Sequence, residues 1–378
     1  MPGMMIDPLD LARRLIACPS VTPADAGAQD VLAAALEGIG FTVHRLTFGE
    51  PPDGPIANLF ATIGSGAPHF AFGGHTDVVP PGNGWAGDPF VATGADGWLV
   101  GRGAADMKGS IAAFAAAAET TVARGFAGTL SLIITGDEEG PATFGTAPLL
   151  DWMAANGHVP DFCLVGEPTS AAVLGDMVKI GRRGSLNAWI TVDGAQGHVA
   201  YPAKADNPVT RLVRILTRAK ERVLDTGSDW FDASNLEVTD LNVGNPAANV
   251  IPAQASARLN IRFNDLHRGA DLEAWLRALV AEEAPSADVV VRISGEAFLT
   301  EPGALSALVT GAIESVTGTT PVLSTSGGTS DARFIRRLCP VVEFGLVGAS
   351  MHKIDEAVPV ADIAALTAIY IEVLMRVF

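Results

Sequence analysis

The chain has 378 residues, of which 48% are hydrophobic and 18% are charged, and this composition is typical of a globular protein rather than a disordered one. Its formal net charge of −17 argues against a nucleic-acid partner, because binding to phosphates needs a basic surface. We expect no membrane partner, since no apolar stretch approaches the ~20 residues that a membrane-spanning helix needs. The length exceeds that of one ordinary core and favours two domains.

The cysteines and the N-terminal residues bear on the compartment. Cys18, Cys163 and Cys339 are scattered and form no Cys-x-x-Cys pair, which indicates neither a disulfide framework nor a thiolate metal site. Acidic Asp7 and Asp10, with no apolar run beside them, are not typical of a signal peptide. We therefore expect a protein of the reducing cytoplasm.

The first half of the chain predicts strands that alternate with helices. Asp7 and Pro8 fit the cap and first position of a helix, and Gly40 fits the end of a second helix. In order, we predict helices at about 8–18 and 24–39, strands at 41–46, 58–63 and 69–72, a helix at 108–123, a strand at 129–135, a helix at 148–156 and a strand at 162–165. This alternation is typical of a parallel or mixed sheet with helices on both faces.

The pattern changes near Gly181. The predicted elements that follow are a strand at 186–192, a helix at 207–224, strands at 236–243 and 255–263, a helix at 269–283 and a strand at 288–293. This β-α-β-β-α-β order is that of the split βαβ sandwich. Alternation returns with a strand at 341–344 and a closing helix from about Ala361. We therefore predict an α/β domain of residues 1–181 and 295–378, into which an α+β domain of residues 182–294 is inserted.

Polar side chains follow the predicted strands where each strand ends. His75 follows the strand at 69–72, Glu138 and Glu139 follow that at 129–135, and Glu167 follows that at 162–165. Sites in such sheets form beyond the carboxyl ends of the strands, so we expect these side chains to meet.

Asp106 and His352 complete a set of oxygen and imidazole donors that suits a pair of divalent metal ions. Taken singly, each donor has a plainer interpretation: a helix cap for Asp106, a surface side chain for His352, loop charges for the glutamates. Jointly they predict a two-metal hydrolase. In this hypothesis Asp106 bridges the ions, the remaining ligands pair as His75 with Glu167 and Glu139 with His352, and Glu138 is a spare base.

Asp77 stands two positions after His75. In an extended segment both side chains leave the same face. The Asp77 carboxylate could then accept a hydrogen bond from the ring nitrogen of His75 that does not bind metal. The alternative is a histidine that caps a turn, with an ordinary aspartate nearby.

With these residues assigned, the chain resembles the co-catalytic zinc aminoacylase and exopeptidase superfamily. The motifs that carry the resemblance span nearly the whole chain: 74–80 (GHTDVVP), 101–109 (GRGAADMKG), 137–140 (DEEG), 166–168 (GEP), 181–185 (GRRGS), 196–202 (QGHVAYP), 249–252 (NVIP), 327–331 (GGTSD) and 352–353 (HK). Segments 181–185, 196–202 and 327–331 are closest to the branch that hydrolyses N-succinylated amino acids.

The resemblance implies a zinc-exopeptidase-like, three-layer catalytic domain with an inserted lid and dimerisation domain. It implies two zinc ions per subunit, for which cobalt may substitute, a small N-acyl amino acid as substrate, and a homodimer. His75, Asp106, Glu139, Glu167 and His352 would bind the metal ions. Asp77 would orient a ligand, Glu138 would act as general acid and base, and His198 would support the developing oxyanion in the partner subunit's site.

The substrate carboxylates need cationic partners, and Arg182, Arg183 and Arg262 are candidates because a guanidinium matches a carboxylate. Further hydrogen bonds could come from Ser185, Asn249, Gly328 and Thr329, for which a structural role is an equal alternative. One departure concerns Gly348, which stands where the superfamily often has an asparagine that could contact substrate.

Two other functions remain open from the sequence. The first is a related amidohydrolase, of the acetylornithine deacetylase or glutamate carboxypeptidase type, because the metal motifs hardly discriminate among them. The second is a non-catalytic binding protein with the same fold. The presence of Glu138 argues against the second, since an idle scaffold has no need of a spare base.

Overall fold

The structure is a computed structural model that describes residues 6–94 and 97–378. Residues 1–5 and 95–96, which fall in the predicted segment 1–181, lie outside the described residues. The chain divides into two compact units. Unit 1 consists of Met1–Ile180, Thr300–Ser324 and Ser330–Phe378, and unit 2 consists of Gly181–Leu299 and Thr325–Thr329.

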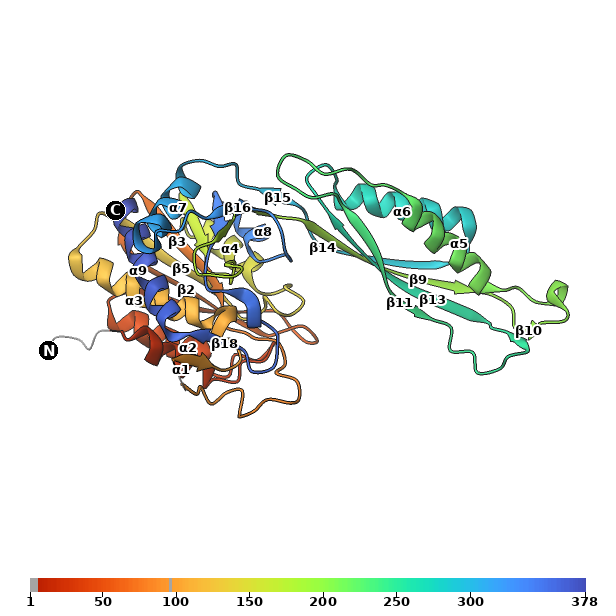
Figure 1. The fold of residues 1–378 in the computed structure, drawn as a ribbon, viewed down its shortest axis with the longest axis horizontal. Helices are drawn as coiled ribbons and strands as arrows, with labels where there is room; N and C mark the ends of the chain where they lie inside the picture. Colours follow the sequence, from red (N-terminus) through yellow and green to blue (C-terminus); the bar gives the residue numbers. More distant parts are fainter. Residues whose placement is uncertain (1–5, 95–96) are drawn as a thin grey trace. The chain divides into compact units, whose positions relative to one another are not determined.

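Unit 1 contains an eight-stranded mixed sheet in the order β1-β2-β5-β3-β6-β17-β7-β16 (Figure 1). Its strands are β1 (Thr42–Phe48), β2 (Ile56–Ser65), β3 (His69–His75), β5 (Gly128–Thr135), β6 (Phe162–Val165), β7 (Met177–Lys179), β16 (Val322–Ser324) and β17 (Val341–Glu343). The neighbours β5, β3, β6 and β17 run parallel, whereas β1 and β2 form an antiparallel edge. A separate antiparallel pair joins β4 (Trp98–Val100) to β18 (Ala357–Pro359).

Helices flank this sheet, and Figure 1 shows α3 and α9 on one side of the strands and α4 and α8 on the other. The helices of unit 1 are α1 (Pro8–Ile16), α2 (Ala28–Gly38), α3 (Gly109–Arg124), α4 (Thr146–Ala155), α7 (Ala304–Thr317), α8 (Ala332–Ile335) and α9 (Val360–Val377). The rings of Phe72 in β3 and Phe114 in α3 stack at 4.1 Å between centroids, which fixes one helical layer against the sheet. The predicted three-layer α/β fold is confirmed.

Local side-chain bonds determine where the first helices begin. Asp7 accepts a hydrogen bond from the backbone N–H of Leu9 at 2.9 Å and so caps α1 as predicted. The second helix begins at Ala28 rather than at the predicted position 24. The reason is Asp25, whose carboxylate accepts the backbone N–H groups of Gly27 at 3.0 Å and Gln29 at 3.1 Å and holds the preceding residues in a turn.

Unit 2 has the predicted β-α-β-β-α-β order. Its antiparallel sheet runs β11-β13-β9-β14. The elements are β9 (Gly184–Asp193), α5 (Pro208–Glu221), β11 (Asn235–Asn242), β13 (Gln254–Phe263), α6 (Gly269–Glu283) and β14 (Asp288–Gly295). Two short ladders pair β8 (Gly181–Arg182) with β15 (Phe298–Leu299) and β10 (Gly197–His198) with β12 (Val250–Ile251).

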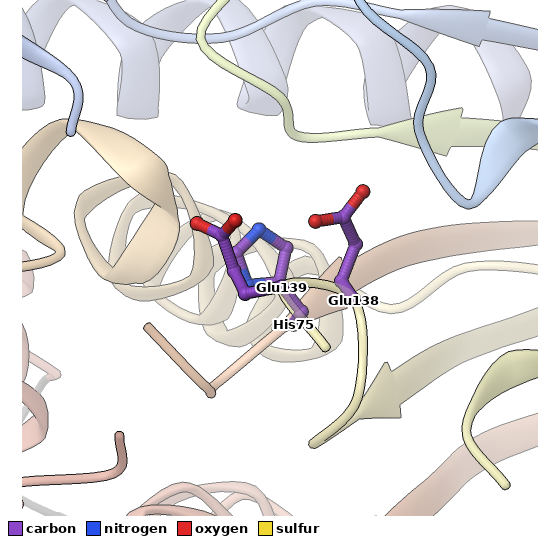
Figure 2. Close-up of side chains that lie close together, drawn as sticks. All are labelled: His75, Glu138 and Glu139. Atoms are coloured by element: carbon purple, nitrogen blue, oxygen red, sulfur yellow. The ribbon is translucent and has the colours of Figure 1, made fainter. Parts of the chain in front are cut away.

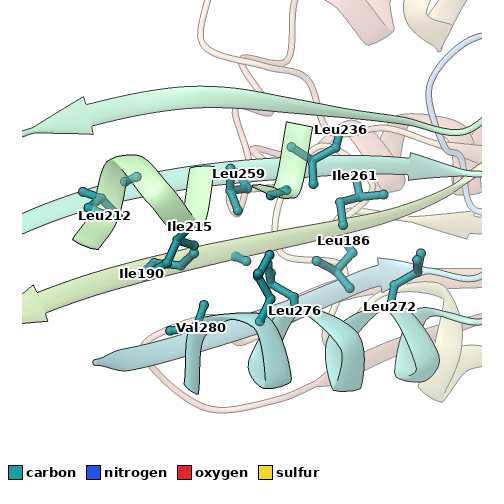
Figure 3. Close-up of a cluster of buried hydrophobic side chains, with 14 of the residues drawn as sticks. Leu186, Ile190, Leu212, Ile215, Leu236, Leu259, Ile261, Leu272, Leu276 and Val280 are labelled. Atoms are coloured by element: carbon teal, nitrogen blue, oxygen red, sulfur yellow. The ribbon is translucent and has the colours of Figure 1, made fainter. Parts of the chain in front are cut away.

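The core of unit 2 lies between one face of its sheet and the two helices. Alternate residues of β9, such as Leu186 and Ile190, point toward Ile215 of α5 and Leu276 of α6 (Figure 3). All four side chains are fully buried. Every second side chain of the strand therefore packs against the apolar faces of α5 and α6, and together they form one apolar layer. Among the helices of the described chain, we find none that is both long and apolar enough to cross a bilayer.

Candidate metal centre

Adjacent parallel strands of unit 1 bring polar side chains to one edge of the sheet. β5, β3 and β6 are neighbours and run in the same direction. His75 is the last residue of β3, Glu138 and Glu139 follow β5, and Glu167 follows β6. Figure 2 shows His75, Glu138 and Glu139 close together. The side chains that follow these strands therefore lie together, as the sequence predicted.

Asp106 and His352 reach the same place from segments outside the sheet. Asp106 lies in the turn Ala104–Lys108 before α3, and His352 lies between the short helix Gly348–Ser350 and β18. Oδ1 of Asp106 is 3.1 Å from Nε2 of His75, and Oδ2 is 3.2 Å from Nε2 of His352. The carboxylate of Asp106 therefore turns one oxygen toward each imidazole.

The donors form groups compact enough for metal ions, because the candidate ligand atoms of each group lie within 4.8 Å of one another. One group is His75, Asp106 and Glu167, and a second is Asp106, Glu139 and His352. In the second, Nε2 of His352 is 2.9 Å from Oε1 of Glu139. Imidazole nitrogens and carboxylate oxygens are ligands that Zn²⁺ accepts. The donor set thus fits two ions that share Asp106.

Negative charge around the two histidines raises their affinity for protons. Burial lowers the pKa of His75, but the hydrogen bond to Asp106 and the charges of Asp106 and Glu138 outweigh it and raise this pKa well above the usual value. Hydrogen bonds to Asp106 and Glu139 raise the pKa of His352 to about 10. The carboxylates of the site are therefore stabilised by positive charge, which bound protons or metal ions can supply.

Glu138 is placed to carry a proton. With His75 and Glu139 it forms a third compact group of donors. Burial, together with the charge of Glu167, raises the pKa of the Glu138 carboxyl well above its usual value. A carboxyl group whose pKa is raised holds a proton more readily than an ordinary carboxylate does, which suits a group that must take up and release one.

Asp77 acts on the site differently from the sequence hypothesis. Nδ1 of His75 is 2.9 Å from the backbone carbonyl oxygen of Asp77, whereas the carboxylate oxygen Oδ1 is 3.6 Å away. The carboxylate instead accepts the backbone N–H groups of Glu138 at 3.2 Å and Glu139 at 3.0 Å. Residue 77 therefore fixes the histidine through its main chain and the two glutamates through its side chain.

The residues predicted to bind substrate all belong to unit 2, whereas the donor groups belong to unit 1. Arg262 and Ser185 are directly opposite each other on β13 and β9. A guanidinium nitrogen of Arg182 donates to the carbonyl oxygen of Gly328 at 3.2 Å, and Thr329 follows in the same loop.

The remaining predicted residues of unit 2 lie in two places. Arg183 donates to Oδ1 of Asn235 at 3.1 Å. His198 is exposed at the end of β10, and the backbone N–H of the next residue, Val199, donates to the carbonyl oxygen of Asn249 at 3.1 Å. His198 and Asn249 are therefore neighbours.

The loop before His352 contains Gly348, which has no room for a side chain. A Cβ atom added to Gly348 would lie 2.7 Å from the carbonyl oxygen of Pro168. The asparagine that is common at this position in the superfamily does not fit this backbone without a shift. Sequence reasoning missed one further residue, Glu356, whose buried carboxylate contacts the turn of Asp106. Its place shortly after the predicted ligand His352 was the only signal.

Solved structures with the same fold include peptidases, one of which is a dinuclear metal binding peptidase. A tripeptidase from Staphylococcus aureus matches with a TM-score of 0.80 at 19% identity, covering 99% of this chain and 99% of that one. A dinuclear metal binding peptidase of the M20 family from Bacillus subtilis matches with a TM-score of 0.72 at 15% identity, covering 98% of this chain and 97% of that one. At these identities the likeness establishes the fold.

The family is established by the sequence itself. The model of peptidase family M20/M25/M40 matches residues 71–376, and the chain belongs to this family. A curated relative from Rhizorhabdus wittichii, named succinyl-diaminopimelate desuccinylase, is 64% identical over 373 residues, which cover 99% of this chain and 98% of the relative.

Proposed function

We propose that the chain hydrolyses N-succinyl-LL-2,6-diaminopimelate to succinate and LL-2,6-diaminopimelate, a step of diaminopimelate and lysine biosynthesis. Family membership and the names of its relatives make the chain a metal-dependent amide hydrolase. The observation that carries the substrate is 64% identity to a relative named for this reaction, over nearly the full length of both chains.

The proposed metal ions are two zinc ions per subunit, with cobalt as a possible substitute. His75 and Glu167 would hold one ion, Glu139 and His352 the other, and Asp106 both. The support is the pair of donor groups that share Asp106. Bound metal would supply a lowered pKa for water and polarisation of the substrate carbonyl.

Glu138 is the proposed proton carrier. Its carboxylate would take a proton from the attacking water and pass it to the nitrogen of the leaving amine. The raised pKa of Glu138 supports this role, because the same group must accept a proton and then give it up. Asp77 would keep the Glu138–Glu139 segment in place through the two N–H groups that its carboxylate binds.

Unit 2 would supply the remaining contacts. Residues 182–294 would form a lid and a dimerisation domain, and His198 would stabilise negative charge on the substrate carbonyl oxygen in the partner subunit's site. Arg182, Arg183 and Arg262 would bind the substrate carboxylates, because guanidinium groups pair well with them. The proposed hydrogen-bonding residues are Ser185, Asn249, Gly328 and Thr329.

The proposed compartment is the cytoplasm. Cys18, Cys163 and Cys339 are all free thiols, which agrees with a reducing environment.

The test is turnover of N-succinyl-LL-2,6-diaminopimelate beside N-acetylornithine by protein of defined metal content. We expect rapid release of succinate, little release of acetate, and loss of both after chelation. A preference for N-acetylornithine would assign the chain to another branch of the family. Full activity without metal would refute the hydrolase mechanism.

A further inference from the structure

A buried carboxylate that belongs to none of the donor groups lies behind the metal centre. Glu356 is 0% exposed. Its Oε1 accepts the backbone N–H groups of Ala105 at 2.8 Å and Asp106 at 3.1 Å. Its Oε2 accepts the backbone N–H of Gly103 at 3.0 Å and the guanidinium of Arg102 at 2.7 Å. A single side chain thus accepts three backbone N–H groups of the segment that presents Asp106, those of Gly103, Ala105 and Asp106.

The main chain of Glu356 holds the same turn. β18 begins at the next residue and pairs with β4. The ladder extends by one hydrogen bond, from the backbone N–H of Gly101 to the carbonyl oxygen of Glu356 at 2.9 Å. Glu356 therefore joins the segment that ends at Asp106 to the segment that begins at His352.

The segment of His352 needs such support. His352 has φ of 61° and Asp355 has φ of 51°, both in the left-handed region that non-glycine residues rarely adopt. Such conformations persist where the surrounding structure holds them. One anchor is Ser350, whose hydroxyl donates to the carbonyl oxygen of Ala357 at 2.7 Å. Glu356 is the anchor that ties this loop to the turn of Asp106.

Arg102 makes the buried charge of Glu356 tolerable. Arg102 is 1% exposed, and it also donates to the carbonyl oxygen of Pro81 at 3.2 Å and lies over the ring of Trp85 at 5.2 Å. A buried carboxylate that is paired and fully hydrogen-bonded avoids the penalty of an isolated charge. The site therefore contains a built-in support for two ligands from distant parts of the chain.

We propose that Glu356 is a positioning residue that fixes Asp106 relative to His352 and thereby sets the metal affinity of the Asp106–Glu139–His352 group. The inference rests on the proposed metal-dependent function and adds to it a residue that binds no metal. It follows that the group of His75, Asp106 and Glu167 depends less on Glu356, because His75 and Glu167 are held by the strands of the sheet.

The test is the stepwise binding of Zn²⁺ to the full-length apoprotein by calorimetry, with Co²⁺ absorption as a second readout. The variants are Glu356→Gln, which replaces one acceptor oxygen by an NH₂ group that opposes backbone donors, and Glu356→Asp, which keeps the charge but draws it back by one methylene. A His352→Ala variant identifies which step belongs to its group. We expect that step to weaken about 10- to 100-fold in both Glu356 variants, and the other step to change much less.

Asp225 of unit 2 offers a matched control. Its carboxylate also organises a turn, by accepting the backbone N–H of Gly227 at 2.8 Å and Nδ2 of Asn264 at 2.7 Å. Asp225→Asn should lower the melting temperature and leave both metal-binding steps as in the wild type. This variant separates loss of stability in general from loss of ligand positioning.

Unchanged affinity in folded Glu356→Gln would overturn the proposal, and so would an equal weakening of both steps. If Glu356→Gln does not fold, Glu356→Asp decides by the same criteria. A wild-type chain that binds no metal would overturn this inference together with the proposed function. Normal metal binding and turnover in the wild type, with unaltered steps in the variants, would overturn this inference alone.

Discussion

Metal binding to the apoprotein should release protons, because histidine ligands are protonated in the metal-free protein. The pKa of His352 is raised to about 10 and that of His75 well above its usual value. The imidazole of His352 is therefore charged at about pH 8, whereas a metal ligand must be neutral. Binding of metal to the group of His352 should then release about one proton from this histidine, and the raised pKa of His75 favours a further contribution from the other group.

The sign of the pH dependence follows from the raised pKa values. Below about pH 10 a proton on His352 competes with the metal, so each unit of falling pH should weaken this group by about tenfold. As the pH rises through about 10, His352 loses its proton in the apoprotein, and its share of the proton release should vanish.

Calorimetric titration with Zn²⁺ in two buffers of different ionisation enthalpy counts the protons directly. The variant His352→Gln should release about one proton fewer than the wild type. A matched control is His267→Gln, which removes a histidine of unit 2 whose Nε2 is 3.0 Å from Asp225, and which should leave the count unchanged. Absence of proton release at about pH 8, or an undiminished count in His352→Gln, would refute the reasoning.

Three further substitutions test separate parts of the molecule. Glu138→Gln should lower kcat by about 10²- to 10⁴-fold with metal content unchanged by elemental analysis, and loss of metal instead would make Glu138 a ligand. His198→Ala should lower kcat by about 10²- to 10³-fold with both metal ions retained, and wild-type rates would remove it from the mechanism. Gly348→Asn should destabilise the fold by about 1–3 kcal/mol in thermal unfolding, since its Cβ would lie 2.7 Å from the carbonyl oxygen of Pro168. An unchanged melting temperature would show that the loop adapts.

The strand-end residues could be found from the sequence because their geometry follows from local pattern. Apolar runs that alternate with helices are typical of a parallel or mixed sheet, and parallel neighbours place their carboxyl ends together, so His75, Glu138 and Glu167 were expected to lie near one another. The order of the predicted strands and helices likewise indicated the split βαβ arrangement of unit 2. These inferences need only the direction of each strand and the residue that follows it.

Other features depend on partners that no local pattern reveals. The short strands β7 and β16 are ordered by pairing with each other, and β4 by pairing with β18. Glu356 binds backbone donors, which every residue possesses, so its partner segment could not be deduced from residue types. The two-residue spacing of Asp77 and His75 predicted a hydrogen bond between the carboxylate and the imidazole. In the structure this carboxylate instead accepts the backbone N–H groups of Glu138 and Glu139.

The most direct test of the paired donor groups is a crystal structure of the zinc-loaded protein with anomalous scattering data. We expect two peaks about 3.5–4 Å apart, on either side of the Asp106 carboxylate, with His75 beside one and His352 beside the other. A single peak, or metal bound away from Asp106, would contradict the two-metal centre.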